Sequence, residues 1–419
     1  MEQPSMQITS GALAPALLTL PWDLPLAAWP EDLLAALPRG ISRHEVRFVN
    51  LPGRVIAIKE IGHRSAYHEY KMLRDLGRLG AQAVRPLAVI TGRKDAQGEE
   101  LTAALVTEHL EFSLPYRAVF SQAMREETAT RLIDSIAVLL VRLHLLNFFW
   151  GDVSLSNTLF RRDADSFSGY LVDAETGEFQ PKLSDHRRLY DLEIARVNII
   201  GELMDLQAGQ LLPADVDAIE IGNAIAAQYE RLWQELTEEQ RLSTSEPWKI
   251  EQRIERLNDL GFDVGELKIT RDSSGDELRI RPRVVDAGHH HRALMRLTGM
   301  DVQEGQARRI LNAITTYQVL NHKERLPIEQ VAHTWLAEVF EPTVAAIPPA
   351  FAAKLEPAQV FHEVLEHQWY LAESRQAEVP LEEAVQAYIR DVLPHHRDEA
   401  VWLDSDPNDE LSEDNRDRR

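Results

Sequence analysis

The fold of this chain is decided by the stretch FFWGDVSLSNTLF, residues 148–160, and by the short segment LVD at residues 171–173. Asp152 and Asn157 lie in a predicted loop between apolar runs, and Asp173 ends a predicted strand. One carboxylate can orient and deprotonate an acceptor hydroxyl, while an amide oxygen and a second carboxylate can hold Mg²⁺ against the phosphates of ATP. This spacing therefore predicts a phosphoryl-transfer site.

The composition limits the class of protein. A chain of 419 residues is too long for one core and predicts two or three domains. With 67 acidic and 45 basic residues the net charge is −22, which argues against broad binding to nucleic acid or anionic membrane by charge alone. The absence of cysteine excludes disulfides, thiolate catalysis and cysteine-ligated zinc. Broken apolar runs and the lack of a signal-like segment predict a soluble, cytoplasmic protein without a membrane span.

The first part of the chain is predicted to form a small sheet. Residues 1–35 are rich in Pro, Ala and Leu, and we expect an irregular arm or short helix lying on the first domain. Residues 44–50 and 54–61 predict a β-hairpin around a Leu-Pro-Gly turn. Strand-like runs at 84–91 and 101–109 would complete a five-stranded sheet. Between them, residues 65–79 predict a helix whose buried face includes Tyr67, Tyr70, Leu73, Leu76 and Leu79.

The following residues predict a helical lobe around the opening stretch. Apolar residues at helical spacing predict helices over 125–146, 187–206 and 214–236. Short apolar segments at 158–160 and 170–172 predict a hairpin. Its geometry would return Asp173 to a position beside Asn157.

These motifs resemble, over residues 40–240, the protein-kinase-like superfamily, whose catalytic loop reads D-x-x-x-x-N and is followed by a metal-binding aspartate. Gly151-Asp152 is more similar to small-molecule and lipopolysaccharide kinases, which often read H-G-D, than to protein kinases. The resemblance implies that Asp152 is catalytic, that Asn157 and Asp173 bind Mg²⁺, and that Lys59, in the strand VIAIK, reaches the phosphates of ATP. It also implies that Glu69 positions Lys59. The alternative for Glu69 is a solvated acid near a helix N-terminus.

The resemblance implies a nucleotide site where the two lobes join. Backbone groups at Glu108 and Leu110 would bond the adenine edge. Gly40 would allow close approach to phosphate, with Arg39, Ser42 or Arg43 as contacts, although a plain loop glycine is the alternative. Asp191 would support the catalytic loop from below, against the alternative of an ordinary acid in the first turn of a helix.

Several positions depart from the family pattern. No glycine-rich loop precedes the hairpin, and Trp150 stands where a structural histidine is usual. His144, in the preceding helix, is expected to be a packing residue rather than a catalytic one. Asp173-Ala174-Glu175 replaces D-F-G, and Glu175 can be a further Mg²⁺ ligand or a solvent-facing acid. No A-P-E motif follows, which argues against a protein substrate.

The third region, residues 246–400, is predicted to be mostly helical with one hairpin. We expect a helix at 249–260, strands at 264–270 and 277–285, a helix at 290–297, and further amphipathic helices over 327–393. Asp301 and Glu304 have the spacing of a capping box that opens a helix reaching about residue 318. Residues 401–419 form a charged tail, which we expect to be disordered.

Arginines and histidines gather in this region. The arginines suggest an anion-binding face, for nucleic acid, a phosphorylated substrate or an acidic partner. The alternative is that they pair with the many acids of the chain. They are Arg279, Arg281, Arg283, Arg292, Arg296, Arg308 and Arg309. The three histidines at 289–291 are adjacent and lack an acid at ligand spacing, which disfavours zinc. The segment from His362 misses an H-E-x-x-H motif by one residue.

We therefore expect an α+β protein with a bilobal protein-kinase-like domain over 36–245 and a mostly helical C-terminal domain over 246–400. The whole chain also resembles a bacterial family of unknown function that joins a lipopolysaccharide-kinase-like domain to an uncharacterised region. The first functional hypothesis is an ATP- and Mg²⁺-dependent phosphotransferase acting on a hydroxyl of a non-protein acceptor. The alternatives are a nucleotide-binding pseudokinase, or a regulator that binds nucleic acid through the arginine face.

Overall fold

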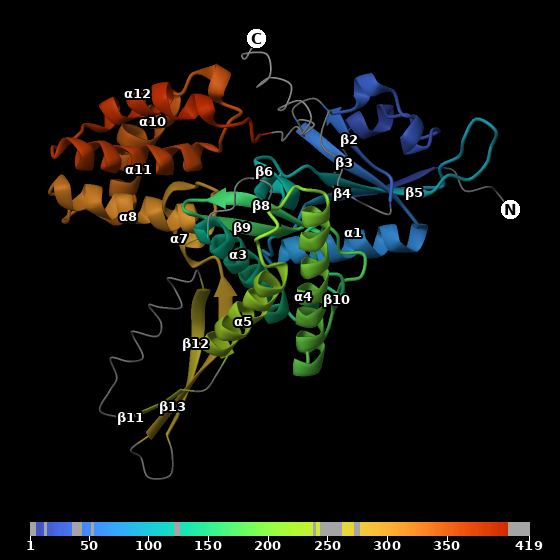
Figure 1. Ribbon diagram of the computed structural model, residues 1–419, viewed down its shortest axis with the longest axis horizontal. Coiled ribbons are helices and arrows are strands. Elements are labelled where there is room, and N and C mark those ends of the chain that lie inside the picture. The colour runs from blue at the N-terminus through green and yellow to red at the C-terminus, as the bar shows by residue number, and fades with distance from the viewer. Residues whose placement is uncertain are drawn as a thin grey trace.

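The computed structural model describes residues 6–11, 15–35, 44–51, 54–120, 126–237, 240–243, 262–271 and 277–400. The chain is α+β: a lobe built on an antiparallel sheet is followed by a helical lobe and a helical C-terminal region, as predicted (Figure 1). Gly40 with its neighbours Arg39, Ser42 and Arg43, the helix expected at 249–260 and the tail at 401–419 lie outside the described residues.

The first lobe is a five-stranded antiparallel sheet in the order β1-β4-β5-β3-β2. Its strands are β1 (Gln7–Ser10), β2 (Val46–Leu51), β3 (Arg54–Ile61), β4 (Pro86–Thr91) and β5 (Ala103–Glu108). Helix α1 (His63–Arg78) follows β3 and buries Leu73 and Leu76 against one face of the sheet. Leu79, expected on the same buried face, is 52% exposed because the helix ends just before it.

The described residues among the first 35 pack on this lobe and add one strand to its sheet. Gln7–Ser10 form the edge strand β1, which pairs with β4. The short 3₁₀ turns η1 (Pro15–Thr19), η2 (Leu26–Ala28) and η3 (Glu31–Leu33) place Trp22, Trp29 and other apolar side chains in the core of the second sheet face. Buried Arg93 fixes them, because its guanidinium donates to the Trp22 carbonyl (3.1 Å) and to Glu60 (2.9 Å).

The helical lobe contains long helices packed beside a small sheet. The helices are α2 (Tyr116–Phe120), α3 (Glu126–Leu145), α4 (Asp185–Ala208) and α5 (Ala218–Thr237). The strands are β6 (Ser113–Pro115), β8 (Thr158–Asp163) and β9 (Ser166–Leu171), in the order β6-β8-β9, with the separate pair β7 (Phe148–Phe149) and β10 (Glu178–Phe179). Helices α4 and α5 approach closely because Gly222 has no side chain; a Cβ there would lie 2.4 Å from Ile200.

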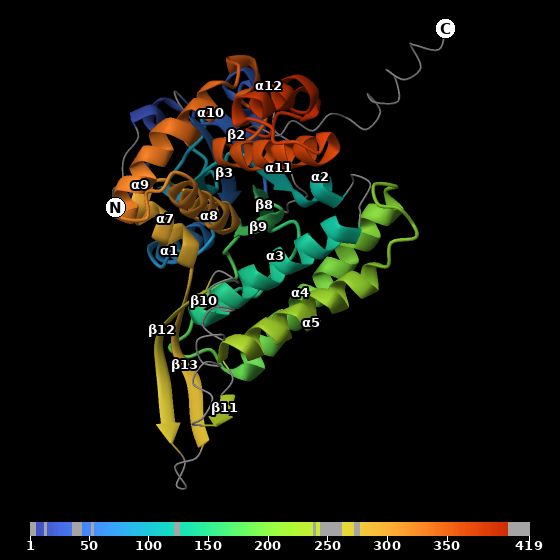
Figure 2. The same ribbon diagram turned by 90° about the vertical axis from the view of Figure 1, so that its left-hand side faces the viewer.

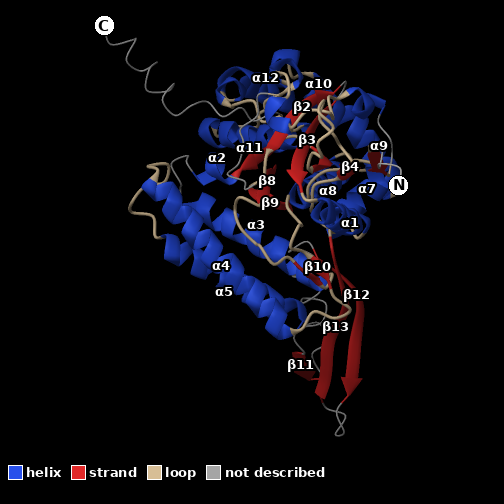
Figure 3. Cartoon of the chain, turned by 90° about the vertical axis from the view of Figure 1, so that its right-hand side faces the viewer, coloured by secondary structure: helices blue, strands red, loops and turns tan. Residues whose placement is uncertain are grey.

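The C-terminal region is mostly helical. Its elements are β11 (Gln240–Ser243), β12 (Phe262–Arg271), β13 (Glu277–Ala287), α7 (His289–Thr298), α8 (Glu304–Leu320), α9 (Ile328–Trp335), the π-helical η4 (Leu336–Phe340), α10 (Glu341–Ala345), η5 (Pro349–Phe351), α11 (Pro357–Arg375), α12 (Leu381–Asp391) and η6 (Leu393–His395). Trp335, Phe340 and Phe361 form the centre of its larger core. The hairpin of β12 and β13 projects away from the rest of the molecule (Figures 2 and 3).

Helix α8 begins differently from the capping box predicted at Asp301 and Glu304. The capping residue is Gln303, whose box partner is Gln306. Glu304 is not available for that role, because its carboxylate accepts from the backbone amides of His290 (2.8 Å) and His291 (3.1 Å). Across the residues that the structure describes, no helix combines the length and the apolar character needed to cross a membrane.

Candidate active site

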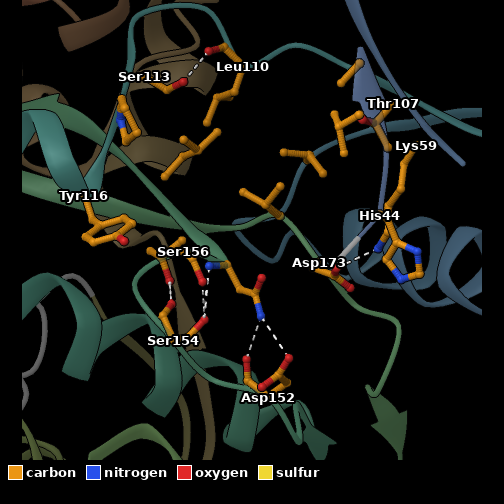
Figure 4. Close-up of a pocket in the computed structure, with 18 of the residues that line it drawn as sticks. His44, Lys59, Thr107, Leu110, Ser113, Tyr116, Asp152, Ser154, Ser156 and Asp173 are labelled. Atoms are coloured by element: carbon orange, nitrogen blue, oxygen red, sulfur yellow. Dashed lines mark hydrogen bonds and ion pairs between the residues drawn. The ribbon is translucent and has the colours of Figure 1, made fainter. Parts of the chain in front are cut away.

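A cavity of about 690 Å³ lies between the sheet lobe and the helical lobe. It is lined by residues of β2, β3, α1 and β5 on one side, and by residues of the 148–160 stretch, β8 and α4 on the other. Figure 4 shows Lys59 and Asp173 on one side of this space and Asp152 below it. Lys59, Glu69, Asp152, Asn157 and Asp173 all line this one cavity.

Lys59, on β3 of the sheet lobe, contacts both Glu69 and Asp173. Its amine Nζ donates to Oε2 of Glu69 at 3.0 Å and to Oδ2 of Asp173 at 2.6 Å. Glu69 is 2% exposed and comes from α1, so the pairing of strand lysine and helix glutamate expected from the sequence is present in the structure. Glu69 is not the solvated helix-terminal acid of the alternative interpretation.

The charges of Lys59, Glu69 and Asp173 influence the pKa values of Lys59 and Glu69. Burial disfavours the charged amine of Lys59, but the carboxylates of Glu69 and Asp173 outweigh that effect and raise the pKa of Lys59. Burial, together with the negative charge of Asp173, raises the pKa of Glu69 to about 8, although Lys59 acts in the opposite direction. A cation bound near Asp173 would offset the negative charge that contributes to this increase.

Asp152 and Asn157 are held against each other in the loop. The side-chain amide Nδ2 of Asn157 donates to the Asp152 carbonyl at 3.0 Å and to its Oδ2 at 3.2 Å. The amide oxygen of Asn157 is then the atom that can accept a cation. Gly151 precedes this pair with φ of +80°, and a Cβ there would lie 3.0 Å from the Phe149 ring and 3.1 Å from the Thr176 carbonyl. Glycine is therefore required at the start of the loop.

Asp191 supports this loop from α4. Its carboxylate is fully buried and accepts from the backbone amides of Trp150 and Gly151, each at 2.8 Å. It also contacts Nε2 of His144 at 3.1 Å, and the other ring nitrogen of His144 contacts the Tyr229 hydroxyl at 2.6 Å. Burial lowers the pKa of His144, so the imidazole stays neutral within this buried group. Asp191 and His144 hold the loop in place and do not line the cavity.

Trp150 links the two halves of the site. Its ring is 1% exposed, and its Nε1 donates to the carbonyl of Asp173 at 2.8 Å. The hydroxyl of Thr176 donates to the carbonyl of Trp150 at 2.8 Å. Trp150 therefore both packs and makes a hydrogen bond between the catalytic loop and the segment that carries Asp173.

Two residues of α4 were not identified from the sequence. Nδ2 of Asn198 lies 3.4 Å from Oδ1 of Asp152 and donates to the Val153 carbonyl at 3.1 Å. One turn later, the carboxylate of Glu202 accepts from the backbone amides of Leu155 (2.6 Å) and Ser156 (3.0 Å). The sequence feature that could have indicated them is a pair of polar residues four positions apart, beside the apolar face of a segment predicted to be helical.

The upper part of the cavity is an apolar slot. Val46 and Ala57 line it from the sheet lobe, and Leu159 and Val172 line it from the helical lobe. Leu105 and Thr107 also line this part, and both belong to β5. A planar base bounded by apolar side chains, with a cation beyond it for phosphate, is what a nucleotide site requires, so the residues present fit ATP.

The residues expected at the lobe junction lie beside this slot. Glu108 and Leu110 both line the cavity, and the carboxylate of Glu108 pairs with Arg85 at 2.5 Å. The Leu110 carbonyl accepts from the Ser113 hydroxyl at 2.6 Å (Figure 4). His109 lies between them, and its amide donates to the Val55 carbonyl at 3.1 Å. The proposed contacts to adenine at Glu108 and Leu110 stay predictions.

Glu175 is one of the departures from the family pattern, and its carboxylate lies close to His44 and Lys59, two residues that line the cavity. Its Oε2 lies 3.1 Å from Nε2 of His44 and 4.0 Å from the amine of Lys59. His44 comes from the segment before β2, so the contact joins the two lobes near Lys59. The role of Glu175 as a Mg²⁺ ligand stays a prediction.

The basic residues of the C-terminal region are only partly described. Arg309 pairs with Asp165 at 3.2 Å, as the alternative of pairing with acids expects. The side chains of Arg279, Arg281 and Arg283 lie outside the described part of β13. Nδ1 of His290 contacts Glu304 at 2.8 Å, and among the described residues no cluster of His, Asp and Glu has the arrangement of a metal site.

Two family models match the chain. Residues 55–198 match the lipopolysaccharide kinase (Kdo/WaaP) family, and residues 231–393 match a domain of unknown function, DUF4032. No curated protein matches the chain. Among solved structures, the chain is similar to "WaaP in complex with acyl carrier protein", with 18% sequence identity and a TM-score of 0.34, over 55% of this chain and 90% of that one.

The two matches divide the chain as the resemblance implies. Lys59, Glu69, Asp152, Asn157 and Asp173 all lie within the first match. The second match begins inside α5, so the boundary expected near residue 245 stays a prediction. The chain joins a lipopolysaccharide kinase (Kdo/WaaP) family domain to a DUF4032 domain.

Proposed function

We propose that this protein is an ATP- and Mg²⁺-dependent phosphotransferase that acts on a hydroxyl of a non-protein acceptor. The observation that carries the proposal is the meeting of Lys59, Glu69, Asp152, Asn157 and Asp173 in one cavity between two lobes. They come from separate elements, so a chance motif would not bring them together. Membership of a lipopolysaccharide kinase family suggests the same class of reaction.

The donor side of the reaction follows from the walls of the cavity. The apolar slot between Ala57 and Leu159 would hold the base of ATP, and the amine of Lys59 would contact its phosphates. Glu69 keeps that amine directed into the cavity. Asn157 and Asp173 would hold Mg²⁺, which when bound neutralises charge on the phosphates.

Asp152 is the group that would act on the acceptor. Asn157 and Asn198 both contact its carboxylate, which fixes the oxygen that faces the acceptor hydroxyl. That oxygen would accept the hydroxyl proton as the hydroxyl oxygen attacks the γ-phosphorus of ATP. The bond between this phosphorus and the oxygen that bridges it to the β-phosphate would break, and ADP would leave. Positioning and charge neutralisation supply most of the rate in such reactions.

The acceptor would enter beside α4. Tyr116 and Arg117 line the cavity on one side of this part, and Gly201 and Asp205 line it from α4. The absence of an A-P-E segment after Asp173 supports a small acceptor rather than a protein. Labelled ATP offered together with a metabolite extract would identify the molecule that gains phosphate.

The substitution Asp152→Ala tests the proposal directly. It should lower phosphate transfer at least about 100-fold while leaving ATP affinity nearly unchanged, because Asp152 faces the acceptor and not the base. Asp185→Ala, at an exposed position of the same α4, is the matched control and should retain full turnover. Unchanged turnover of Asp152→Ala would remove the proposal.

A second candidate is a nucleotide-binding pseudokinase. The observation that favours it is the direct bond of 2.6 Å between Lys59 and Asp173, which occupies both residues with each other. Trp150 and Asp173-Ala174-Glu175 are further departures from active kinases. ATP hydrolysis measured beside ATP-induced thermal stabilisation separates the two, because binding without turnover selects the pseudokinase.

A further inference from the structure

The hairpin of β8 and β9 connects the two proposed Mg²⁺ ligands and carries its far end into the C-terminal region. Asn157 precedes β8, and Asp173 follows β9 after one residue. At the near end, the amide of Val172 donates to the carbonyl of Asn157 at 3.0 Å. At the far end, the residues from Arg161 to Asp165 each contact the C-terminal region.

Two of these contacts are ion pairs. Arg162 donates to Glu399 through Nε and Nη2 at 2.8–2.9 Å, and the side chain of Glu399 is 4% exposed. Glu399 is itself fixed, because its amide donates to the carbonyls of Ala353 (3.0 Å) and Lys354 (3.1 Å). Arg161 donates to Glu356 at 2.7 Å.

The turn of the hairpin is held by the start of α8. Oδ1 of Asp163 accepts from the amide of Gln306 at 2.8 Å, and the amide of Gly305 donates to the same carboxylate. A Cβ on Gly305 would lie 2.8 Å from Oδ1 of Asp163, so this close approach needs glycine. Gln359 of α11 adds two bonds to the backbone of Ala164, at 3.1 and 3.2 Å.

The C-terminal region also reaches the lobe junction. The amide of Phe112, two residues after Leu110, lies 3.5 Å from the carbonyl of Ala400. Strand β6 follows directly and pairs with β8. The C-terminal region therefore contacts both the far end of the β8–β9 hairpin and the segment that follows Leu110.

We propose that the DUF4032 region with the segment through residue 400 is a brace that sets the separation of Asn157 and Asp173 by holding the far end of the β8–β9 hairpin. Near the site, β8 pairs with β6 and Gly169 of β9 packs against α3, whereas the far end of the hairpin is held by the C-terminal region. Loss of the far-end contacts should therefore loosen the hairpin from that end. The six residues of β8 span about 20 Å at ~3.3 Å per residue, which lets Glu399 act on the site without touching it. Glu399 and Asp163 are positioning residues, and this role rests on the proposed function.

The substitution Glu399→Ala, in the otherwise complete chain, tests the brace. It should speed hydrogen exchange in the backbone of residues 158–173. It should also raise the Mg²⁺ concentration for half-maximal binding of ATP about fivefold or more. The affinity for ATP without metal should change less. Arg375→Ala is the matched control, because it removes an exposed ion pair to Glu383 within the same region. It should leave both measurements at the wild-type values.

Unchanged exchange over residues 158–173 together with an unchanged Mg²⁺ midpoint in Glu399→Ala would overturn the brace. Should Glu399→Ala fail to fold, Glu399→Gln keeps the size of the side chain and loses its charge, and the same two outcomes apply. Neither measurement requires phosphate transfer. A wild-type protein that binds Mg²⁺ and ATP but transfers no phosphate would contradict the proposed reaction. The brace would still be tested by hydrogen exchange and by the Mg²⁺ dependence of ATP binding.

Discussion

The buried carboxyl of Glu69 has a consequence for stability that can be measured. Its pKa is raised to about 8 in the folded protein by burial and by Asp173, against an ordinary value of 4.5. Between these pH values the folded protein holds a proton that the unfolded chain releases. Stability from this group is therefore present below pH 4.5 and is lost as the pH rises through about 8, at up to about 1.4 kcal/mol per pH unit.

The substitution Glu69→Gln should flatten this dependence. Glutamine keeps a polar side chain beside Lys59 but carries no titrating group. The melting temperature of the nucleotide-free protein, measured from pH 5.5 to 8.5, should fall less with pH in Glu69→Gln than in the wild type. Glu178→Gln, at an exposed position, should follow the wild-type curve. Parallel curves for all three proteins would show that Glu69 is already ionised at neutral pH.

At the level of single residues, the sequence predicted which residues meet in the cavity, but it did not predict all of the residues that support the loop. Asp152, Asn157 and Asp173 could be predicted because their order and spacing carry chemistry. Asn198 and Glu202 could not be predicted, because their contacts with the backbone of the loop correspond to no repeated pattern in the sequence. Gly40 lies outside the described residues, so its contact with phosphate stays a prediction.

Helix α4 is the element that supports the catalytic loop along its length. Asp191 holds the first residues of the loop, Asn198 the aspartate, and Glu202 the following backbone. These residues are spaced seven and four positions apart, so they lie on one face of the helix. Helix α4 therefore supports the loop from outside, in addition to the hydrogen bonds within the loop.

The substitution Asp191→Asn should loosen the start of the loop. The amide group of asparagine can replace only part of the contacts to Trp150, Gly151 and His144, so a buried donor loses its partner. The expected cost is about 1–3 kcal/mol in the free energy of unfolding, with a loss of turnover larger than that of ATP affinity. Urea unfolding measures the first and steady-state kinetics the second.

Glu193→Gln provides the comparison for this substitution. Glu193 lies on the same helix and pairs with Arg196 at the surface, where such pairs contribute little. Equal stability of the two variants would mean that α4 does not hold the loop through Asp191.

The elements were predicted from periodicity, and the exceptions have physical reasons. The helices and hairpins that the sequence predicted in both lobes agree with the structure within a few residues, because a repeated apolar face marks each one. The short elements α2, β6, β7 and β10 were not predicted. Strand β1 was missed because four residues with one partner strand are too few for a periodic signal. The capping box of α8 differs from the predicted one because Glu304 accepts hydrogen bonds from His290 and His291, and the sequence near Glu304 does not indicate this contact.

For the whole molecule, nucleotide and metal should stabilise the folded state together. A ligand at about 100 times its dissociation constant adds about 2.7 kcal/mol to the free energy of unfolding. In wild-type protein, adding Mg²⁺ to saturating ATP should raise the melting temperature beyond the effect of ATP alone. In Asp173→Asn that additional increase should be largely lost, because one carboxylate ligand is gone.

The same measurement with a chelator present is the control for this prediction. ATP alone should then stabilise wild-type protein and Asp173→Asn to a similar extent, because the apolar slot is unaffected. A full Mg²⁺ effect in Asp173→Asn would show that the metal is held elsewhere, with Glu175 as the next residue to substitute.

The edge strand β1 bears on how the protein can be divided for study. A fragment cut at the limits of the kinase-family match, residues 55–198, would lack β1 and β2, the tryptophans that cover the sheet, and helix α5. Its newly bared apolar surfaces would favour aggregation. Recombinant fragments intended for binding or crystallisation should therefore start before residue 7 and extend through residue 400.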